Sequence, residues 1–293
     1  KGKKTERPKD VAPVATASPP IVMGATAAKY KATQSNTGPI LQATSLTKRY
    51  GGLLANSDID FTVNHGEIRG IIGPNGAGKS TFFKMLTCEV TPTSGKIVFD
   101  GSDITGLDVA AACQRGLTKS YQINQLFERL TVRQNLSIAA LGEIRGRFRF
   151  DLLKSLSKVP GLDAQVEHTA RLVRLVERLD TPVSELAYGE KRRLEIGLAL
   201  ATSPSLLLLD EPLAGMSTQE RVDTVALLKS IAQGRTMIVI DHDMDSLFEL
   251  VEKVTVLQEG RILVEAATPD EIKNNAAVQE AYLGGVDGEV DFA

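Results

Sequence analysis

Short apolar runs bounded by turn residues predict β-strands in two parts of the chain. These runs are residues 40–46, 59–63, 68–72, 96–101, 206–209 and 236–240. The first two are expected to form a hairpin-like pair. The run 206–209 consists of four leucines between helical segments, which is typical of a parallel strand covered on both faces. The later strands are therefore expected at the centre of a parallel sheet.

Between residues 131 and 179 the apolar positions change to helical spacing. We expect a helical subdomain here, at about residues 124–200, inserted into the strand-containing core. The order of the elements predicts an α/β fold with a doubly wound, mainly parallel sheet and an antiparallel β portion before it.

The two ends of the chain lack periodicity. Residues 1–39 are rich in Pro, Ala, Thr, Ser and Lys, so we expect a disordered tail or linker before a domain at residues 40–285. Residues 286–293 are expected to be a flexible C-terminal tail. The basic first ten residues fit a solvated tail, or a cytoplasmic segment that follows a membrane domain fused upstream of Lys1.

Composition narrows the possible partners. The formal net charge of −2 gives no electrostatic reason to expect nucleic acid. Cys88 and Cys113 lie well apart and in no metal-ligand spacing, so we expect ordinary buried thiols in a reducing compartment. No apolar stretch approaches the roughly 18 to 20 residues that span a bilayer, so any link to a membrane is expected to run through another polypeptide or a further segment.

A glycine-rich segment after the strand 68–72 carries the clearest chemistry. It fits the pattern GxxxxGK[ST] and consists of Gly73, Pro74, Asn75, Gly76, Ala77, Gly78, Lys79, Ser80 and Thr81. The glycines let the backbone turn its N–H groups inward at a helix start, where an anion is favoured. Lys79 can reach the β and γ phosphates of a nucleotide, and the Ser80 hydroxyl can ligate Mg²⁺. A turn that binds nothing is disfavoured because the lysine and the hydroxyl are both present.

Polar residues at two strand ends add a hydrolytic constellation. Asp210 and Glu211 follow the leucine run, where open α/β sheets bind ligands. We expect Asp210 to hold Mg²⁺, directly or through water, and Glu211 to orient the attacking water. The alternative for Glu211 is an exposed helix-capping acid. His242 follows the strand 236–240, from which its imidazole can sense the γ-phosphate.

Two more segments fit this chemistry. Gln122 lies at the junction of core and insert, where its amide can touch Mg²⁺ or the water. Residues 186–190 precede a helix at 191–201 and offer free N–H groups to a second anion. The residues concerned are Ala187, Tyr188, Gly189 and Glu190. Because the first cradle meets this chain's own phosphate needs, the second is expected to act on the nucleotide of a partner subunit.

Together these motifs resemble those of the ATP-binding subunits of ABC transporters, over residues 41–285. The matches are Tyr50 with the aromatic residue that stacks on adenine, residues 73–81 with Walker A, Gln122 with the Q-loop, residues 186–190 with the signature motif, residues 206–211 with Walker B and His242 with the switch histidine. The resemblance implies a P-loop NTPase core, ATP and Mg²⁺ as cofactors, and ATP hydrolysis. It assigns catalytic roles to Lys79, Gln122, Glu211 and His242.

The same resemblance implies partners. It implies a head-to-tail pair with a second ABC ATPase, identical or a sister subunit, and membrane permease subunits at the cytoplasmic face. A solute-binding protein outside the cell is an indirect partner. Residues 186–196 and 278–284 look like the branched-chain amino acid importer group, although urea, amide and aromatic-acid uptake systems share much of this pattern.

Two departures from the family pattern affect the expected dimer. Ala187 and Tyr188 stand where the signature usually has Ser and Gly, so the serine hydroxyl that meets the γ-phosphate is absent. Ser217 stands where the loop after Walker B often has aspartate, which leaves coupling between the two sites open.

Other function classes remain as alternatives. A soluble ABC ATPase acting on ribosomes or nucleic acid would share the hydrolytic motifs. Such proteins usually have two ATPase halves, a coiled-coil insertion or a basic face, none of which is visible in the sequence. A regulatory module that binds nucleotide without hydrolysis is disfavoured by Glu211 and His242, and a GTPase by Tyr50.

Overall fold

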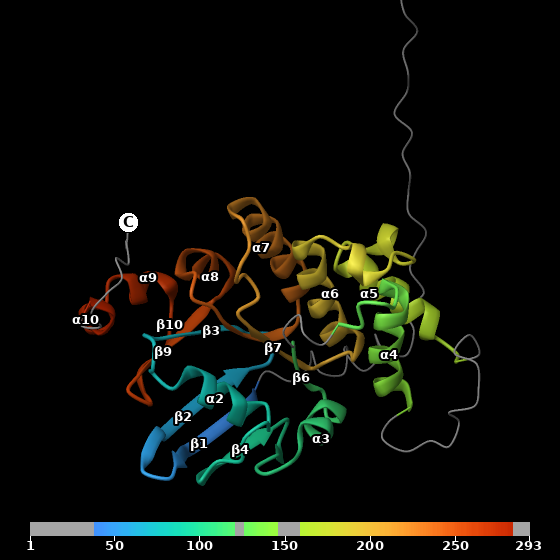
Figure 1. Cartoon of the computed structure of the whole chain (residues 1–293). Helices are drawn as coiled ribbons and strands as arrows, with labels where there is room; N and C mark the ends of the chain where they lie inside the picture. Colours follow the sequence, from blue (N-terminus) through green and yellow to red (C-terminus); the bar gives the residue numbers. More distant parts are fainter. Residues whose placement is uncertain (1–37, 121–125, 146–158, 284–293) are drawn as a thin grey trace, which may run out of the picture.

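The computed structural model describes residues 38–120, 126–145 and 159–283, which form two β-sheets with surrounding helices (Figure 1). The expected tails at residues 1–39 and 286–293 lie outside this part of the chain, apart from Gly38 and Pro39. Their disorder therefore stays a prediction.

The larger sheet has six strands in the order β10-β9-β3-β8-β7-β6. They are β3 (Ile68–Ile72), β6 (Leu117–Lys119), β7 (Leu206–Asp210), β8 (Thr236–Ile240), β9 (Lys253–Gln258) and β10 (Arg261–Ala267). All neighbours are parallel except β10 and β9. The strands predicted at 68–72, 206–209 and 236–240 are confirmed, whereas the apolar pattern did not predict β6, β9 and β10.

Alternate residues of β7 face opposite sides of this sheet. Leu206 and Leu208 belong to one hydrophobic cluster, and Leu207 and Leu209 belong to another. All four side chains are buried. The run is continuously apolar because both faces of the strand are covered.

The smaller sheet is antiparallel, in the order β2-β1-β4-β5. Its strands are β1 (Pro39–Tyr50), β2 (Leu53–Asn64), β4 (Ser94–Phe99) and β5 (Ser102–Asp103). The predicted hairpin is confirmed, and it extends beyond the predicted strands because Tyr50 still pairs with Leu53 across the turn.

This sheet packs with α2 (Lys79–Leu86) and α3 (Val109–Gln114) against one face of the larger sheet. The Phe61 ring of β2 meets the Phe82 ring of α2 edge-on, with 5.2 Å between centroids. The helix that follows the phosphate loop is thereby fixed against the antiparallel sheet.

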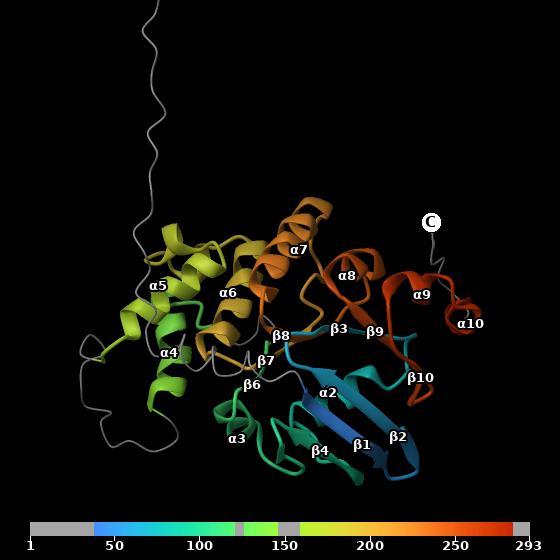
Figure 2. The ribbon, with the colours of Figure 1, turned by 180° about the vertical axis from the view of Figure 1, so that it is seen from behind.

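Helices share one hydrophobic cluster with the other face of the larger sheet, some packing on the sheet and others on neighbouring helices. They are α4 (Val132–Arg145), α5 (Leu162–Leu172), α6 (Tyr188–Ala201), α7 (Thr218–Ala232) and α8 (Met244–Leu250), with the short turns η3 (Val176–Arg178) and η4 (Val183–Glu185). In both views α4, α5 and α6 lie together at the opposite end of the molecule from α9 (Pro269–Lys273) and α10 (Ala276–Leu283) (Figures 1 and 2). These three helices fall within the predicted insert, whose bounds at 124–200 stay a prediction.

Two expectations about composition bear on this fold. Cys88 and Cys113 are free thiols and are half-buried, not fully buried as expected. Among the described residues, no helix is long and apolar enough to cross a membrane.

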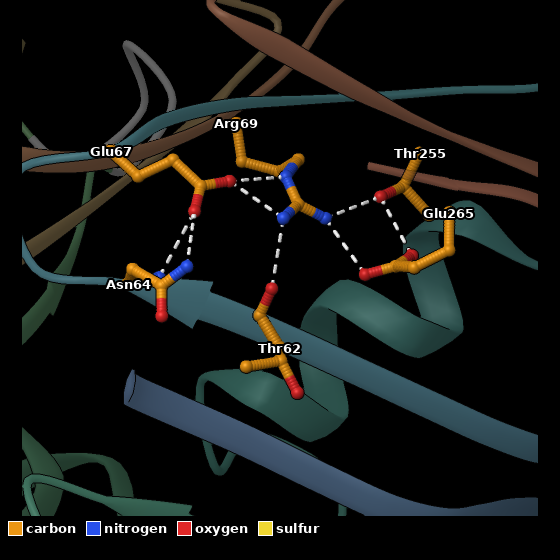
Figure 3. A network of polar contacts seen from close by, with 6 residues as sticks. All are labelled: Thr62, Asn64, Glu67, Arg69, Thr255 and Glu265. Carbon is orange, nitrogen blue, oxygen red and sulfur yellow. Dashed lines mark hydrogen bonds and ion pairs between the residues drawn. The ribbon is translucent and has the colours of Figure 1, made fainter. Parts of the chain in front are cut away.

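A buried arginine connects the two sheets (Figure 3). Arg69 of β3 is 1% exposed. Its guanidinium donates to Glu67 Oε1 at 2.6 Å, to the Thr62 carbonyl of β2 at 2.9 Å, and to Thr255 Oγ1 and Glu265 Oε1 at 2.8 Å each. These contacts tie β2 of the smaller sheet to β3, β9 and β10 of the larger one. A buried ion of this kind is tolerated because its N–H groups are paired.

We predict that Arg69→Met lowers the free energy of unfolding by about 3 to 5 kcal/mol, because it leaves the Glu67 carboxylate buried without its counter-charge. Urea denaturation followed by circular dichroism measures this change. Arg261→Met is the matched control, because Arg261 is exposed in β10 and its loss should change stability by less than about 0.5 kcal/mol. Equal effects of the two substitutions would contradict the prediction.

Candidate active site

The phosphate loop occupies residues 73–78, between β3 and α2. Gly73 has φ 153° and Gly78 has φ 92°, both in the region that favours glycine. A Cβ at Gly73 would lie 2.2 Å from the Leu257 carbonyl oxygen, and one at Gly78 would lie 2.6 Å from that of Ala55. Neighbouring backbone therefore requires glycine at both ends of the loop.

Lys79 folds back over this loop from the first turn of α2. Its Nζ donates to the carbonyl oxygens of Gly73 at 2.5 Å and Pro74 at 2.9 Å. Burial lowers the pKa of the Lys79 ammonium, and the nearby Glu211 carboxylate acts in the opposite direction. Lys79 is buried, whereas the neighbouring Ser80 is exposed.

The strand ends beside the loop bring the expected acid and histidine together. Glu211 follows β7 and His242 follows β8, and His242 Nε2 lies 2.8 Å from Glu211 Oε1. Glu211 has φ 49°, a conformation that is costly for a residue with a side chain, and its N–H donates to the Ile240 carbonyl at 2.7 Å. The alternative of a helix-capping acid does not apply, because Ser217 caps the next helix, α7.

Asp241 holds the loops after β7 and β8 in place. It is 4% exposed and accepts hydrogen bonds from the N–H of Leu213 at 3.0 Å and of Asp243 at 3.1 Å. Burial raises the pKa of this carboxyl, and these backbone donors partly offset the shift. The segment that carries Glu211 is thus bonded directly to the segment that carries His242.

Lys119 is a charged residue of the site that the sequence did not indicate. It ends β6, and its Nζ lies 3.2 Å from Asp210 Oδ2 and 3.0 Å from Glu89 Oε1. The ammonium also lies 5.2 Å from the centre of the Phe83 ring of α2. Lys119 therefore joins the strand before the Q-loop, the Walker B aspartate and the helix after Walker A. The sequence offered no signal for these contacts, because β6 itself was not among the predicted strands.

Tyr282 is a second residue whose position was not anticipated. It lies on α10, with its hydroxyl near the backbone of Gly73. Burial raises the pKa of this hydroxyl to about 12, and the backbone N–H of Gly73 acts in the opposite direction. The sequence around Tyr282 indicated only a resemblance, so its contact with the phosphate loop is a finding of the fold.

The signature residues lie apart from the phosphate loop. They are at the start of α6, which belongs to the helical group formed by α4, α5 and α6 (Figure 1). The helix begins at Tyr188, three residues earlier than predicted, and Glu190 accepts from the Ala187 N–H at 3.0 Å. Gly189 lies against the Glu220 carboxylate of α7: a Cβ added at Gly189 would lie 2.9 Å from Glu220 Oε1. The turn therefore faces an anionic group of its own chain.

The other predicted site residues have simpler positions. Tyr50 ends β1 and is 45% exposed, with Lys48 Nζ 5.0 Å from the centre of its ring. Thr81 is half-buried in α2. Gln122 lies outside the described residues, so its expected contact with Mg²⁺ stays a prediction.

Glu195 is a buried carboxyl group on α6. It is 6% exposed, its Oε2 accepts from Arg192 at 3.2 Å, and its Oε1 is buried without a hydrogen-bond partner. Burial raises the pKa of Glu195 to about 7, although Arg192 acts in the opposite direction.

Comparison with known proteins agrees with this arrangement. The family model described as ABC transporter matches residues 56–214, more than half of the chain. The chain belongs to the ABC transporter ATPase family. A second model, described as branched-chain amino acid ATP-binding cassette transporter, matches residues 267–288, which include α9 and α10.

Relatives with curated names cover most of this ABC ATPase. The high-affinity branched-chain amino acid transport ATP-binding protein BraF of Pseudomonas aeruginosa is 35% identical over 251 residues, which are 84% of this chain and 98% of that protein. Its counterpart LivG of Escherichia coli is 34% identical with the same coverage. The lipopolysaccharide export system ATP-binding protein LptB of Haemophilus influenzae is 35% identical, over 84% and 97% of the two chains.

Solved structures give the same fold. A nucleotide-free ATP-binding cassette from an ABC transporter has a TM-score of 0.73 and 28% identity, over 86% of this chain and all of that one. An ABC transporter cassette in its ADP conformation has a TM-score of 0.73 and 30% identity, over 85% and 100% of the two chains. The predicted P-loop NTPase core is confirmed.

We predict that Glu195→Gln makes stability less dependent on pH. Folding raises the pKa of Glu195 from 4.5 to about 7. The contribution of this residue to the free energy of unfolding is therefore fully present below pH 4.5 and is lost as the pH rises to about 7. Across this pH interval, the free energy of unfolding of the variant should therefore rise by about 2 to 3 kcal/mol relative to that of the natural protein. Urea denaturation at several pH values measures it, with exposed Glu167→Gln as control. A difference that does not change with pH would contradict the assignment.

Proposed function

We propose that this chain hydrolyses Mg-ATP as one subunit of a head-to-tail ABC ATPase dimer and powers uptake of branched-chain amino acids. The observation that carries hydrolysis is the 2.8 Å contact between Glu211 and His242, at the strand ends next to the Lys79 loop. A carboxylate held by an imidazole beside a phosphate cradle suits activation of water.

The binding roles follow from the positions of the side chains. Residues 73–81 supply backbone N–H groups to the phosphates, and Lys79 exchanges the Gly73 and Pro74 carbonyls for phosphate oxygens. The exposed Tyr50 ring offers a face for adenine.

The residues present also fit Mg²⁺. Ser80 and Asp210 offer hard oxygen donors, and Gln122 is the proposed third ligand. Mg²⁺ commonly uses one or two carboxylates plus substrate phosphates, so a larger acidic cluster is not needed. When bound, the ion offsets the charge of the β and γ phosphate oxygens.

In the proposed reaction, Glu211 accepts a proton from a water molecule whose oxygen attacks the γ-phosphorus in line. The bond from the γ-phosphorus to the bridging oxygen breaks, and its electron pair leaves with ADP. His242 holds the Glu211 carboxylate in position through the hydrogen bond between them. Catalysis then depends on positioning and on charge stabilisation by Lys79.

The partner ATPase is proposed to supply its own signature turn. Ala187, Tyr188, Gly189 and Glu190 would close over the γ-phosphate bound to the opposite subunit. Permease subunits would receive this motion through Gln122 and the helical group, at the cytoplasmic face of the membrane.

The amino acid substrate is proposed from the comparisons. The relatives BraF and LivG are named for branched-chain amino acid transport, and the second family model matches residues 267–288. The relative LptB has similar identity but is named for lipopolysaccharide export, so the argument for the substrate class depends mainly on this C-terminal match.

We predict that Glu211→Gln lowers the rate of ATP turnover at least about 100-fold, because the amide cannot accept the proton of water. ATP affinity should be retained, and a nucleotide-bound dimer should accumulate on size-exclusion chromatography. Phosphate release measures turnover. Glu252→Gln, which changes an exposed acid just before β9, should behave like the natural protein. Turnover that survives in Glu211→Gln would remove Glu211 from the role of base.

We predict that the chain restores uptake of radiolabelled leucine when it is expressed with its permease and binding protein in cells that lack this uptake. The Glu211→Gln variant in the same system should not restore it, because uptake requires hydrolysis. If the natural protein instead supports uptake of urea or an aromatic acid, the substrate class is wrong while the ATPase assignment stands.

A further inference from the structure

The signature turn is bonded to the loop that follows Walker B in the same subunit. The Tyr188 hydroxyl donates to the Ala214 carbonyl at 3.1 Å and accepts from Arg192 Nε at 3.2 Å. The Arg192 guanidinium also lies 5.5 Å from the centre of the Tyr188 ring. Tyr188 is thus fixed on one side by α6 and on the other by the loop at residues 211–217.

The loop is shaped to accept this tyrosine. Gly215 has φ 74°, and a Cβ added there would lie 2.8 Å from Tyr188 Oη and 3.3 Å from the adjacent ring carbon. Any side chain at this position would push the hydroxyl away from Ala214. Close approach of Tyr188 therefore depends on glycine at residue 215.

A second contact joins the same two segments. Gly189 lies against the Glu220 carboxylate, because a Cβ added there would lie 2.9 Å from Glu220 Oε1. The same carboxylate accepts from Ser217 N at 2.9 Å and Ser217 Oγ at 2.7 Å. Tyr188 and Gly189 are consecutive residues, so one turn of α6 contacts both the loop after Walker B and the start of α7.

The Tyr188 contact leads directly to the proposed base. Ala214 accepts from Tyr188 through its carbonyl and donates through its N–H to the Glu211 carbonyl at 3.2 Å. Leu213 donates to Asp241 at 3.0 Å, next to His242. A shift of the Tyr188 hydroxyl thus acts on the carbonyl of Ala214, a residue whose own N–H is hydrogen-bonded to the Glu211 carbonyl.

We propose that Tyr188 is a positioning residue that links the signature turn to Glu211 of its own subunit, through Ala214. The inference rests on the proposed function, in which the signature turn meets the partner's ATP. Closure over that nucleotide then orients the base that acts on this subunit's own ATP. The tyrosine, which stands where the family usually has glycine, supplies a link that a glycine side chain cannot make.

The test is Tyr188→Phe, which removes the hydroxyl and keeps the ring of a half-exposed residue. The kcat of ATP hydrolysis should fall about two- to tenfold, as expected for one neutral hydrogen bond. The KM for ATP should not change, because the turn is proposed to meet the partner's phosphate through backbone N–H groups, which Tyr188→Phe keeps. On the Glu211→Gln background, Tyr188→Phe should still accumulate the ATP-bound dimer.

Gly215→Ala provides an independent variant. It should lower kcat in the natural background and lower it less in the Tyr188→Phe background, because the hydroxyl that its Cβ displaces is already absent there. The strain from the positive φ is common to both backgrounds and cancels in the double-mutant cycle. Gln219→Met, which removes only an exposed contact to Asp223 on α7, is the control for unchanged kcat.

Three results would overturn the inference: an unchanged kcat in Tyr188→Phe, additive effects of the two substitutions, or a loss of kcat that comes with weaker dimer accumulation and a lower unfolding midpoint. The last result would mean a structural role only. In each case the natural protein still hydrolyses ATP and Glu211→Gln still does not, so the proposed function would stand. Failure of the proposed function would instead appear as turnover in Glu211→Gln.

Discussion

Parallel pairing of β3, β8 and β7 in a single register is the constraint on which the active site depends. Ile71 pairs with Ile240, and Ile240 pairs with Asp210, so the three strands end at one edge of the sheet. The phosphate loop, His242 and Glu211 follow directly from these ends. A slip of one residue would turn every side chain of a strand to the opposite face. The buried apolar faces of these strands therefore fix the positions of the polar groups beyond their ends.

Contacts within the chain hold the phosphate loop from several sides. At Gly73, Tyr282 lies near the backbone N–H, Lys79 donates to the carbonyl, and the Leu257 carbonyl fills the space of a side chain. Arg69 anchors the preceding strand to the smaller sheet. Donors fixed in this way lose little freedom when a phosphate binds, which is the basis of electrostatic preorganisation.

The sequence predicted the parts of this structure that have local causes. Four leucines in succession specified β7, and GxxxxGK[ST] specified the loop, because each depends on neighbouring residues only. β9 and β10 were missed because polar residues such as Lys253, Thr255 and Glu265 interrupt their apolar pattern. The ion pairs of Lys119 were also missed, since Glu89 and Asp210 come from distant segments. Contacts of this kind arise from tertiary packing, which no local pattern encodes.

The turn proposed as a second anion site lies at the start of α6, where it faces the Glu220 carboxylate of its own chain. Hydrogen bonds from Ser217, and a further one from Gly189, hold the pKa of Glu220 below its usual range, so this carboxylate is ionised where it meets the turn. In the proposed dimer, a γ-phosphate oxygen has the same sign of charge as Glu220, so the two repel each other when the phosphate approaches this turn. Glu220 also takes part in the cap of α7 through Ser217. The start of α7 follows the loop of Glu211, so this repulsion acts on the same segment that Tyr188 contacts.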